Sequence, residues 1–91
     1  GSLPGEWGSL EISHANILLS ALKPAETDGV VLRLYEASGV AVEGVEVRLP
    51  AKVATVEEVN LMEDLIQPLQ LMGGVLLLDF HPFEIKTVRL K

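Results

Sequence analysis

The sequence predicts an all-β protein, an antiparallel β-sandwich of about seven or eight short strands. Apolar residues recur mainly at alternate positions, as they do in strands. Gly, Pro, Asn and Asp separate these runs at short intervals, and no stretch keeps the apolar period of a helix over a helix's usual length. Some runs are apolar on both faces and others on one face only, a mixture that favours a sandwich over a barrel.

The clearest strand lies within VVLRLYEASG, residues 30–39, which follows the turn signal Asp28-Gly29. Alternation gives it one apolar face and one face that carries Arg33 and Tyr35. We expect an inner strand whose arginine pairs with a carboxylate, either Glu84 or Glu36.

Two strands are expected before this stretch. Residues 10–14 alternate as a half-buried strand, and residues 16–26 form a longer strand with apolar groups on both faces. We expect the longer strand to be central. Pro24 either ends its hydrogen-bonded pairing or lies at an edge position, because proline has no N–H to donate. Residues 27–29 then form a hairpin connection.

The rest of the chain continues the same pattern. Residues 40–50 form a strand with one polar face, and Gly44 marks a bulge in it. Residues 52–62 form a less regular strand, and Leu65-Ile66 is predicted to be a turn or a single helical turn. Gly73-Gly74 joins residues 69–72 to residues 75–80 in a hairpin, with 75–80 buried on both faces, and residues 81–91 form the last strand.

Composition limits the classes of function. The net charge of -6 argues against nucleic acid and anionic membrane surfaces as partners, since both need clustered basic residues. There is no cysteine, which is compatible with the cytoplasm, the compartment we expect. No apolar run is long enough to span a bilayer. The 48% hydrophobic content is high for a small domain and predicts an exposed apolar patch that faces a neighbour.

The domain boundaries follow from composition at the start of the chain. Gly1-Ser2 looks like a remnant of cloning, and the rest of residues 1–9 contains the breakers of a linker. We therefore expect the domain to span residues 10–91. Because no initiator methionine is present, we expect the chain to be a piece of a longer protein.

We predict no catalytic, cofactor-binding or metal-binding residue in this chain. His14 and His81 lack the spacing of a metal motif. In an extended segment Glu57 and Glu58 point to opposite faces, so they cannot serve as the facing carboxylates of a glycosidase. Neighbouring Ser13 and His14 are expected to point apart for the same reason, which excludes a nucleophile–base pair. The pair Glu63-Asp64 is expected to be a solvated part of a loop.

The aromatic residues leave a carbohydrate platform as a minor alternative. Aromatic residues make up only 4% of the chain. Trp7 and Tyr35 are the candidates for sugar contact, whereas Phe80 and Phe83 are expected to be core residues.

Three segments resemble the C-terminal β-sandwich domain of glycoside hydrolase family 38 α-mannosidases. They are SALKPAE at 20–26, GVVLRLYEASG at 29–39 and HPFEIKTVRLK at 81–91. The acidic loop at 61–65 also resembles a feature of that family. The resemblance covers most of the chain outside the linker.

The resemblance implies a parent enzyme that hydrolyses α-mannosidic bonds with retention, through zinc held in a separate catalytic domain. None of the family's nucleophile or zinc ligands maps onto this chain. The expected role is a non-catalytic accessory domain that packs on the rest of the same polypeptide and meets mannose-containing glycans only through the parent. We expect structural roles for Arg33, Glu36, Phe83 and Glu84. The alternatives are a carbohydrate-binding module and a fibronectin-like spacer or adhesion module.

Overall fold

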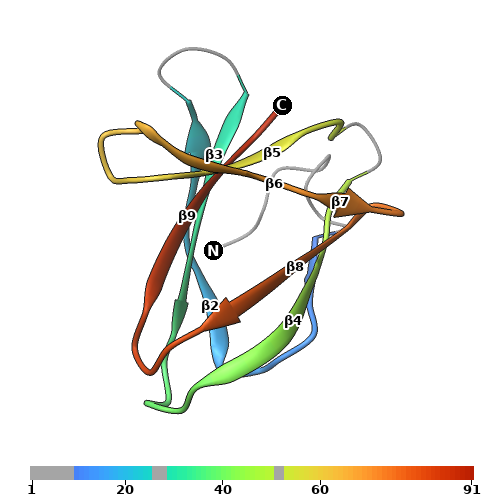
Figure 1. Cartoon of the computed structure of the whole chain (residues 1–91). Helices are drawn as coiled ribbons and strands as arrows, with labels where there is room; N and C mark the ends of the chain where they lie inside the picture. The colour runs from blue at the N-terminus through green and yellow to red at the C-terminus, as the bar shows by residue number, and fades with distance from the viewer. Residues whose placement is uncertain (1–9, 26–28, 51–52) are drawn as a thin grey trace.

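The computed structural model describes residues 10–25, 29–50 and 53–91, and in those ranges β-strands are joined by turns and loops without any helix. No helix capable of crossing a membrane occurs there. The strands form two antiparallel sheets that face each other, which confirms the predicted sandwich (Figure 1). The strands are β1 Glu11–Ile12, β2 Ile17–Pro24, β3 Val30–Glu36, β4 Val42–Arg48, β5 Val56–Val59, β6 Leu65–Leu69, β7 Leu71–Met72, β8 Val75–Phe80 and β9 Ile85–Leu90.

The larger sheet has five strands in the order β2-β3-β9-β5-β6, and the smaller has four in the order β1-β4-β8-β7. β3 therefore lies inside its sheet, as its sequence predicts. The prediction that β2 is central is wrong, because β2 is the edge strand beside β3. The apolar groups on both faces of β2 are partly buried at this edge. Pro24 also lies on this edge strand, one of the two positions predicted for it.

The turns largely agree with the sequence. The hairpin between β2 and β3 is confirmed, although residues 26–28 of its turn lie outside the described residues. Gly73 and Gly74 have φ of 61° and 80° and join β7 to β8, as expected of a tight hairpin turn. Gly44 has φ of 67° and lies where the register between β4 and β8 shifts, which confirms the bulge.

Three local predictions are wrong. Leu65-Ile66 begins the strand β6 and is neither a turn nor a helical turn, because this strand pairs with the short strand β5. β8 is not buried on both faces, since Leu77 is 57% exposed on its outer side. Phe83 is not in the core: it is 67% exposed, has φ of 59° and belongs to the turn before β9.

The core lies between the two sheets. Inward residues of β3 and β9 meet inward residues of β4 and β8, and six of these residues are fully shielded from water. Burial of this apolar surface is the main force that holds the sheets together. The buried core residues are Ile17, Leu32, Leu34, Val45, Val47, Leu49, Val53, Val56, Leu76, Leu78, Phe80, Val88 and Leu90.

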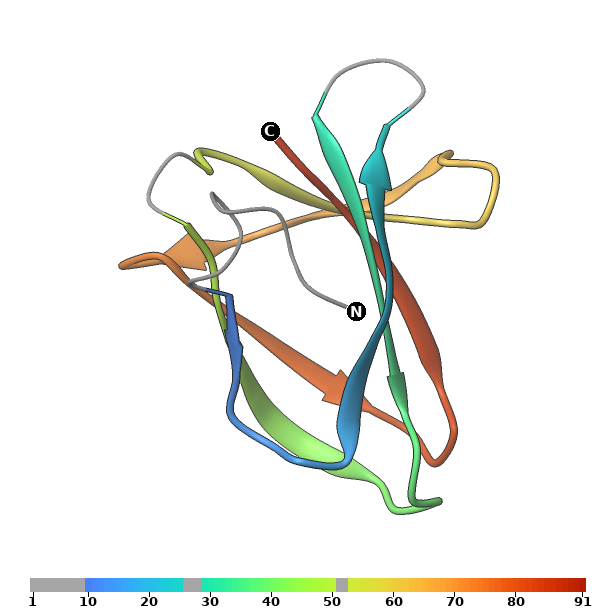
Figure 2. The same ribbon diagram turned by 180° about the vertical axis from the view of Figure 1, so that it is seen from behind.

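The β5–β6 hairpin projects past β9 when the molecule is seen from either side (Figures 1 and 2). Its loop is held by Asn60, whose Oδ1 accepts hydrogen bonds from the backbone N–H groups of Met62 (2.8 Å) and Asp64 (3.0 Å). The side-chain oxygen thus takes the place of a backbone acceptor and fixes the loop. The acidic pair Glu63-Asp64 lies in this loop, as expected.

Candidate functional site

The described residues contain no arrangement suited to hydrolysis. No group of three or more His, Asp or Glu side chains among them is placed to hold a metal ion. β5 is extended, as predicted, so Glu57 and Glu58 point apart: Glu57 bonds to Arg89, and Glu58 bonds to Gln67 at 2.8 Å. Glu57 and Glu58 therefore cannot act together on one substrate.

The prediction that Ser13 and His14 point apart is wrong. Ser13 Oγ lies 2.7 Å from His14 Nδ1, because this segment is a bend and not a regular strand. Ser13 Oγ also accepts a hydrogen bond of 2.8 Å from the Glu46 backbone N–H. No described carboxylate contacts the ring to orient it, as a nucleophile–base pair would require. Through this bond to Glu46, Ser13 links the connection between β1 and β2 to β4.

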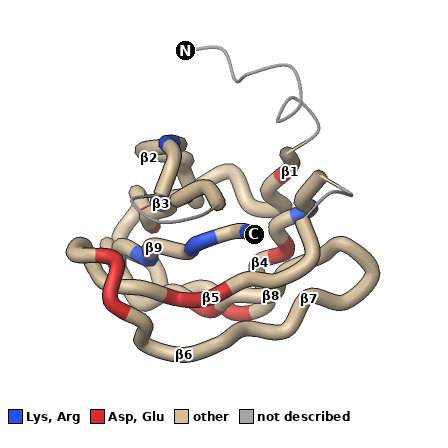
Figure 3. The backbone as a smooth tube through the Cα atoms, turned by 90° about the horizontal axis from the view of Figure 1, so that it is seen from above, with Lys and Arg blue, Asp and Glu red and all other residues tan. Residues whose placement is uncertain are grey.

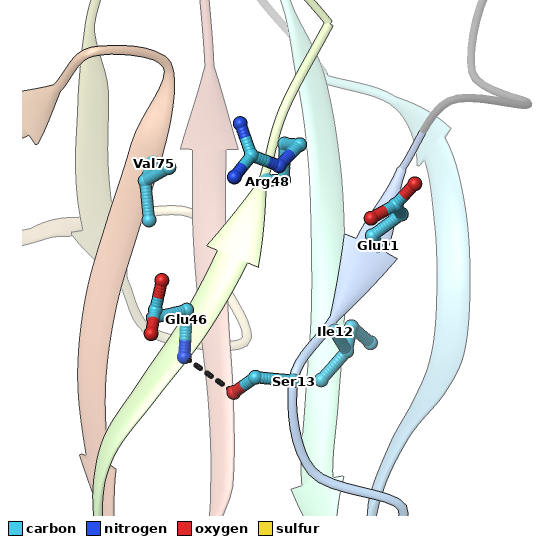
Figure 4. Close-up of a pocket in the computed structure, with 6 residues that line it drawn as sticks. All are labelled: Glu11, Ile12, Ser13, Glu46, Arg48 and Val75. Carbon is cyan, nitrogen blue, oxygen red and sulfur yellow. Dashed lines mark hydrogen bonds between the residues drawn. The ribbon is translucent and has the colours of Figure 1, made fainter.

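A hollow of about 130 Å³ lies on the outer face of the four-stranded sheet, beside Ser13 (Figure 4). Glu11 and Arg48 face each other across β1 and β4 at its upper end, and both are exposed. Glu46 is exposed as well. The hollow presents solvated charges of both signs and holds no buried polar group, so it offers little that could fix a ligand.

The most strongly organised polar group is Glu36, at the end of β3. Its side chain is completely buried. Oε2 accepts hydrogen bonds from Asn16 Nδ2 (2.8 Å), the Ser38 N–H (2.8 Å) and Ser38 Oγ (2.5 Å). Oε1 accepts from the N–H groups of Gly39 (2.6 Å), Val40 (3.0 Å) and Phe83 (3.1 Å).

These bonds determine the charge of Glu36. Burial by itself would raise the pKa of this carboxyl group. The hydrogen bonds from Ser38, Phe83 and Asn16 outweigh burial and hold its pKa well below the usual range. Glu36 is therefore an ionised acceptor whose lone pairs are used internally, which makes it a structural group and leaves nothing to donate to a substrate.

Glu36 connects three loops at the lower end of Figure 1: the β1–β2 connection, the β3–β4 connection and the β8–β9 turn. It thereby links the segments RLYEASG and HPFEIK, which are far apart in sequence. The Glu36 N–H also donates to the Glu84 carbonyl oxygen at 2.9 Å. Phe83 lies over Gly39, where an added Cβ would meet the aromatic ring.

The prediction that Arg33 pairs with Glu84 or Glu36 is also wrong. Arg33 lies on the outer face of β3, whereas the Glu36 side chain is on the inner face with its oxygens occupied. Glu84 bonds instead to the His81 N–H (2.8 Å) and approaches Lys86 (3.6 Å). Arg33 Nε is buried and has no hydrogen-bond partner in the described part of the chain.

The outer face of the five-stranded sheet holds a larger hollow, of about 370 Å³, around Arg33. Its walls come from β3, β9, β5 and the β5–β6 hairpin. Three exposed apolar side chains line it: Leu61 (68% exposed), Ile66 (57%) and Ile85 (59%). The sequence predicted an apolar patch but did not place it. In β9, Ile85 points to the outer face while Val88 and Leu90 point into the core, so apolar residues on both faces of this strand are the local sign of the patch.

The two candidates for sugar contact are not brought together by any described feature. Tyr35 is half-buried on the outer face of β3, opposite Leu18 of β2 and Ile85 of β9. Trp7 lies outside the described residues. A platform built by both aromatic rings therefore stays a prediction.

Comparisons with known proteins agree with the motifs. Residues 16–88 match the family model described as the glycosyl hydrolases family 38 C-terminal beta sandwich domain. No curated protein and no solved structure matches the chain. The match covers most of the chain and includes β2 to β8 and the greater part of β9. This match shows that the chain belongs to the family of glycosyl hydrolase family 38 C-terminal β-sandwich domains.

Proposed function

We propose that this domain is a non-catalytic accessory part of an α-mannosidase and that it packs on the rest of that enzyme. The single observation that carries the proposal is the family match over residues 16–88. The parent would cleave α-mannosidic bonds with retention, and its zinc would be held by residues outside the described part of this chain.

The polar chemistry of the domain supports a structural role. The buried carboxylate of Glu36 accepts hydrogen bonds from within the domain, and Arg89 donates a hydrogen bond of 2.8 Å to Glu57. A domain of this kind contributes to its parent by covering apolar surface of the neighbouring part and by stabilising it.

The test compares the parent enzyme with a version that lacks residues 10–91. We expect the shortened enzyme to melt at a lower temperature and to lose zinc and mannosidase activity faster on warming. Unchanged melting, zinc retention and activity would refute the packing role. Activity toward other glycosides with none toward α-mannosides would keep the accessory role and refute the assignment to mannosidases.

A further inference from the structure

The hollow around Arg33 differs from the neighbouring part of the same sheet face. Arg33 of β3 pairs in register with Thr87 of β9, and Thr87 pairs with Val59 of β5. No residue of this row is acidic, so the row itself offers Arg33 no carboxylate. Two residues along β9, the next row carries Arg89, which donates two hydrogen bonds to the Glu57 carboxylate (2.8 and 3.1 Å). Figure 3 shows the basic segment of β9 next to the acidic segment of β5.

The two arginines therefore differ in whether their N–H donors find acceptors within the domain. Arg89 also reaches the Glu63 carbonyl oxygen at 3.4 Å, so its donors are used within the domain. Arg33 has a buried Nε without a partner in the described ranges. Glu58 lines the same hollow, but its oxygens are engaged by Gln67 (2.8 Å) and Lys86 (3.8 Å). A buried, unpaired donor costs free energy until an acceptor is supplied.

The rim of the hollow adds a second requirement. Leu61, Ile66 and Ile85 expose more than half of their side-chain surface around it. Apolar side chains grouped about one buried cationic donor are complementary to a segment of opposite character: apolar groups flanking an anion. A carboxylate would give the guanidinium the two-point hydrogen bond that it forms best.

We propose that this outer face is the surface on which the domain docks against the remainder of its own polypeptide, through an apolar segment that carries a carboxylate bonded to Arg33. The inference rests on the proposed function, which supplies the larger polypeptide. Beyond that function, the inference specifies that the five-stranded sheet makes the contact and that the rest of the polypeptide presents an apolar segment with a carboxylate.

The experiment uses the parent enzyme and cysteine labelling, since this domain has no cysteine of its own. Ile85→Cys places a thiol in the docking face. Leu77→Cys is the matched control, because Leu77 is equally exposed (57% against 59%) but lies on the other sheet. We expect a thiol reagent to modify Ile85→Cys at least about tenfold more slowly than Leu77→Cys, since an interface core excludes water. Peptide mass spectrometry separates these sites from cysteines elsewhere in the parent.

A second comparison tests the carboxylate. Arg33→Glu should place like charges together and restore rapid labelling of Ile85→Cys, whereas Arg48→Glu, an exposed arginine of β4, should leave the protection intact. Equal labelling rates at positions 85 and 77 in the native parent would overturn the docking face. If removal of residues 10–91 still destabilised the parent, the accessory role would stand without it.

Two further outcomes would assign the face to another occupant and overturn the proposal. Protection of Ile85→Cys that disappears on dilution, as the parent's oligomer dissociates, would place a second copy there. Protection that requires added mannose would place a glycan there.

Discussion

Replacing Glu36 by glutamine tests whether one buried carboxylate organises the lower end of the sandwich. Glu36→Gln keeps the size of the side chain but removes its charge and turns one oxygen into an NH₂ group. Three donors point at each carboxylate oxygen. Whichever oxygen is replaced, three donors lose a charged acceptor, and the N–H groups among them then face another donor.

The expected loss is large for a domain of this size. Each hydrogen bond to a buried charged acceptor is worth several degrees of Tm in a small domain, so we expect Glu36→Gln to lower Tm on the order of 10–20 °C at pH 7. Ser38→Ala removes one donor among those that surround Oε2 and should lower Tm by roughly 5 °C. Glu43→Gln, at an exposed position of β4, is the control and should leave Tm unchanged.

The pH dependence gives an independent signature. Because the folded-state pKa of Glu36 is lowered, its stabilising contribution is complete above the unfolded pKa of about 4.3 and is lost as pH falls toward the folded pKa. The Tm difference between the unchanged chain and Glu36→Gln should therefore narrow as pH is lowered from 5 to about 2. Circular dichroism melts of the 91-residue chain at several pH values measure it.

Two results would refute this account. If Glu36→Gln melted within a few degrees of the unchanged chain at pH 7, the six hydrogen bonds would not be a main support of these loops. If the Tm difference stayed constant down to pH 2, the ionised form would not be what the loops require. Should Glu36→Gln fail to fold, the smaller Ser38→Ala effect carries the same test.

Three further predictions concern the core, a turn and an ion pair. Leu32→Ala empties a fully buried site and should lower the free energy of unfolding by about 2–5 kcal/mol in urea titrations, while Leu77→Ala at an exposed site should change it by less than about 0.5 kcal/mol. Gly29→Ala should cost more than about 1 kcal/mol in the same assay, because φ is 92° and the new Cβ would collide with the Leu90 carbonyl oxygen; a neutral result would mean that the turn adjusts freely. The hydrogen bond from Arg89 lowers the pKa of Glu57, so Glu57→Gln should lower Tm more at pH 7 than near pH 3. Equal losses of Tm at both pH values would contradict the assignment.

The strand pattern could be predicted from sequence wherever alternation and turn chemistry agree. VVLRLYE lies between glycine-containing turns and alternates cleanly, so its position inside a sheet was predictable. Leu65-Ile66 was missed because a short apolar pair followed by Pro68 lacks alternation and contains a residue that avoids strand interiors. An edge strand tolerates that proline, and edge position is a property of the whole sheet.

The organisation of polar groups was less predictable. That Glu36 takes backbone donors from loops far along the chain follows from tertiary proximity, which alternation does not encode. The same holds for Arg33, because its two expected partners, Glu36 and Glu84, bond to other groups. For Phe83, the backbone at φ of 59° turns the side chain out of the strand pattern that its neighbours suggest.

The place of β9 in the larger sheet has a consequence for how the chain folds. β9 lies between β3 and β5, so Val30 pairs with Leu90 and Glu57 with Arg89. Until β9 leaves the ribosome, β3 and β5 have no shared partner, and the β5–β6 hairpin cannot join the sheet. Such pairings between distant segments are slow to form, because the chain loses conformational entropy on closing the loop before the stabilising contacts exist. During synthesis the inner edges of β3 and β5 are left unpaired, and a chaperone or an already folded parent domain could protect them until the sheet closes.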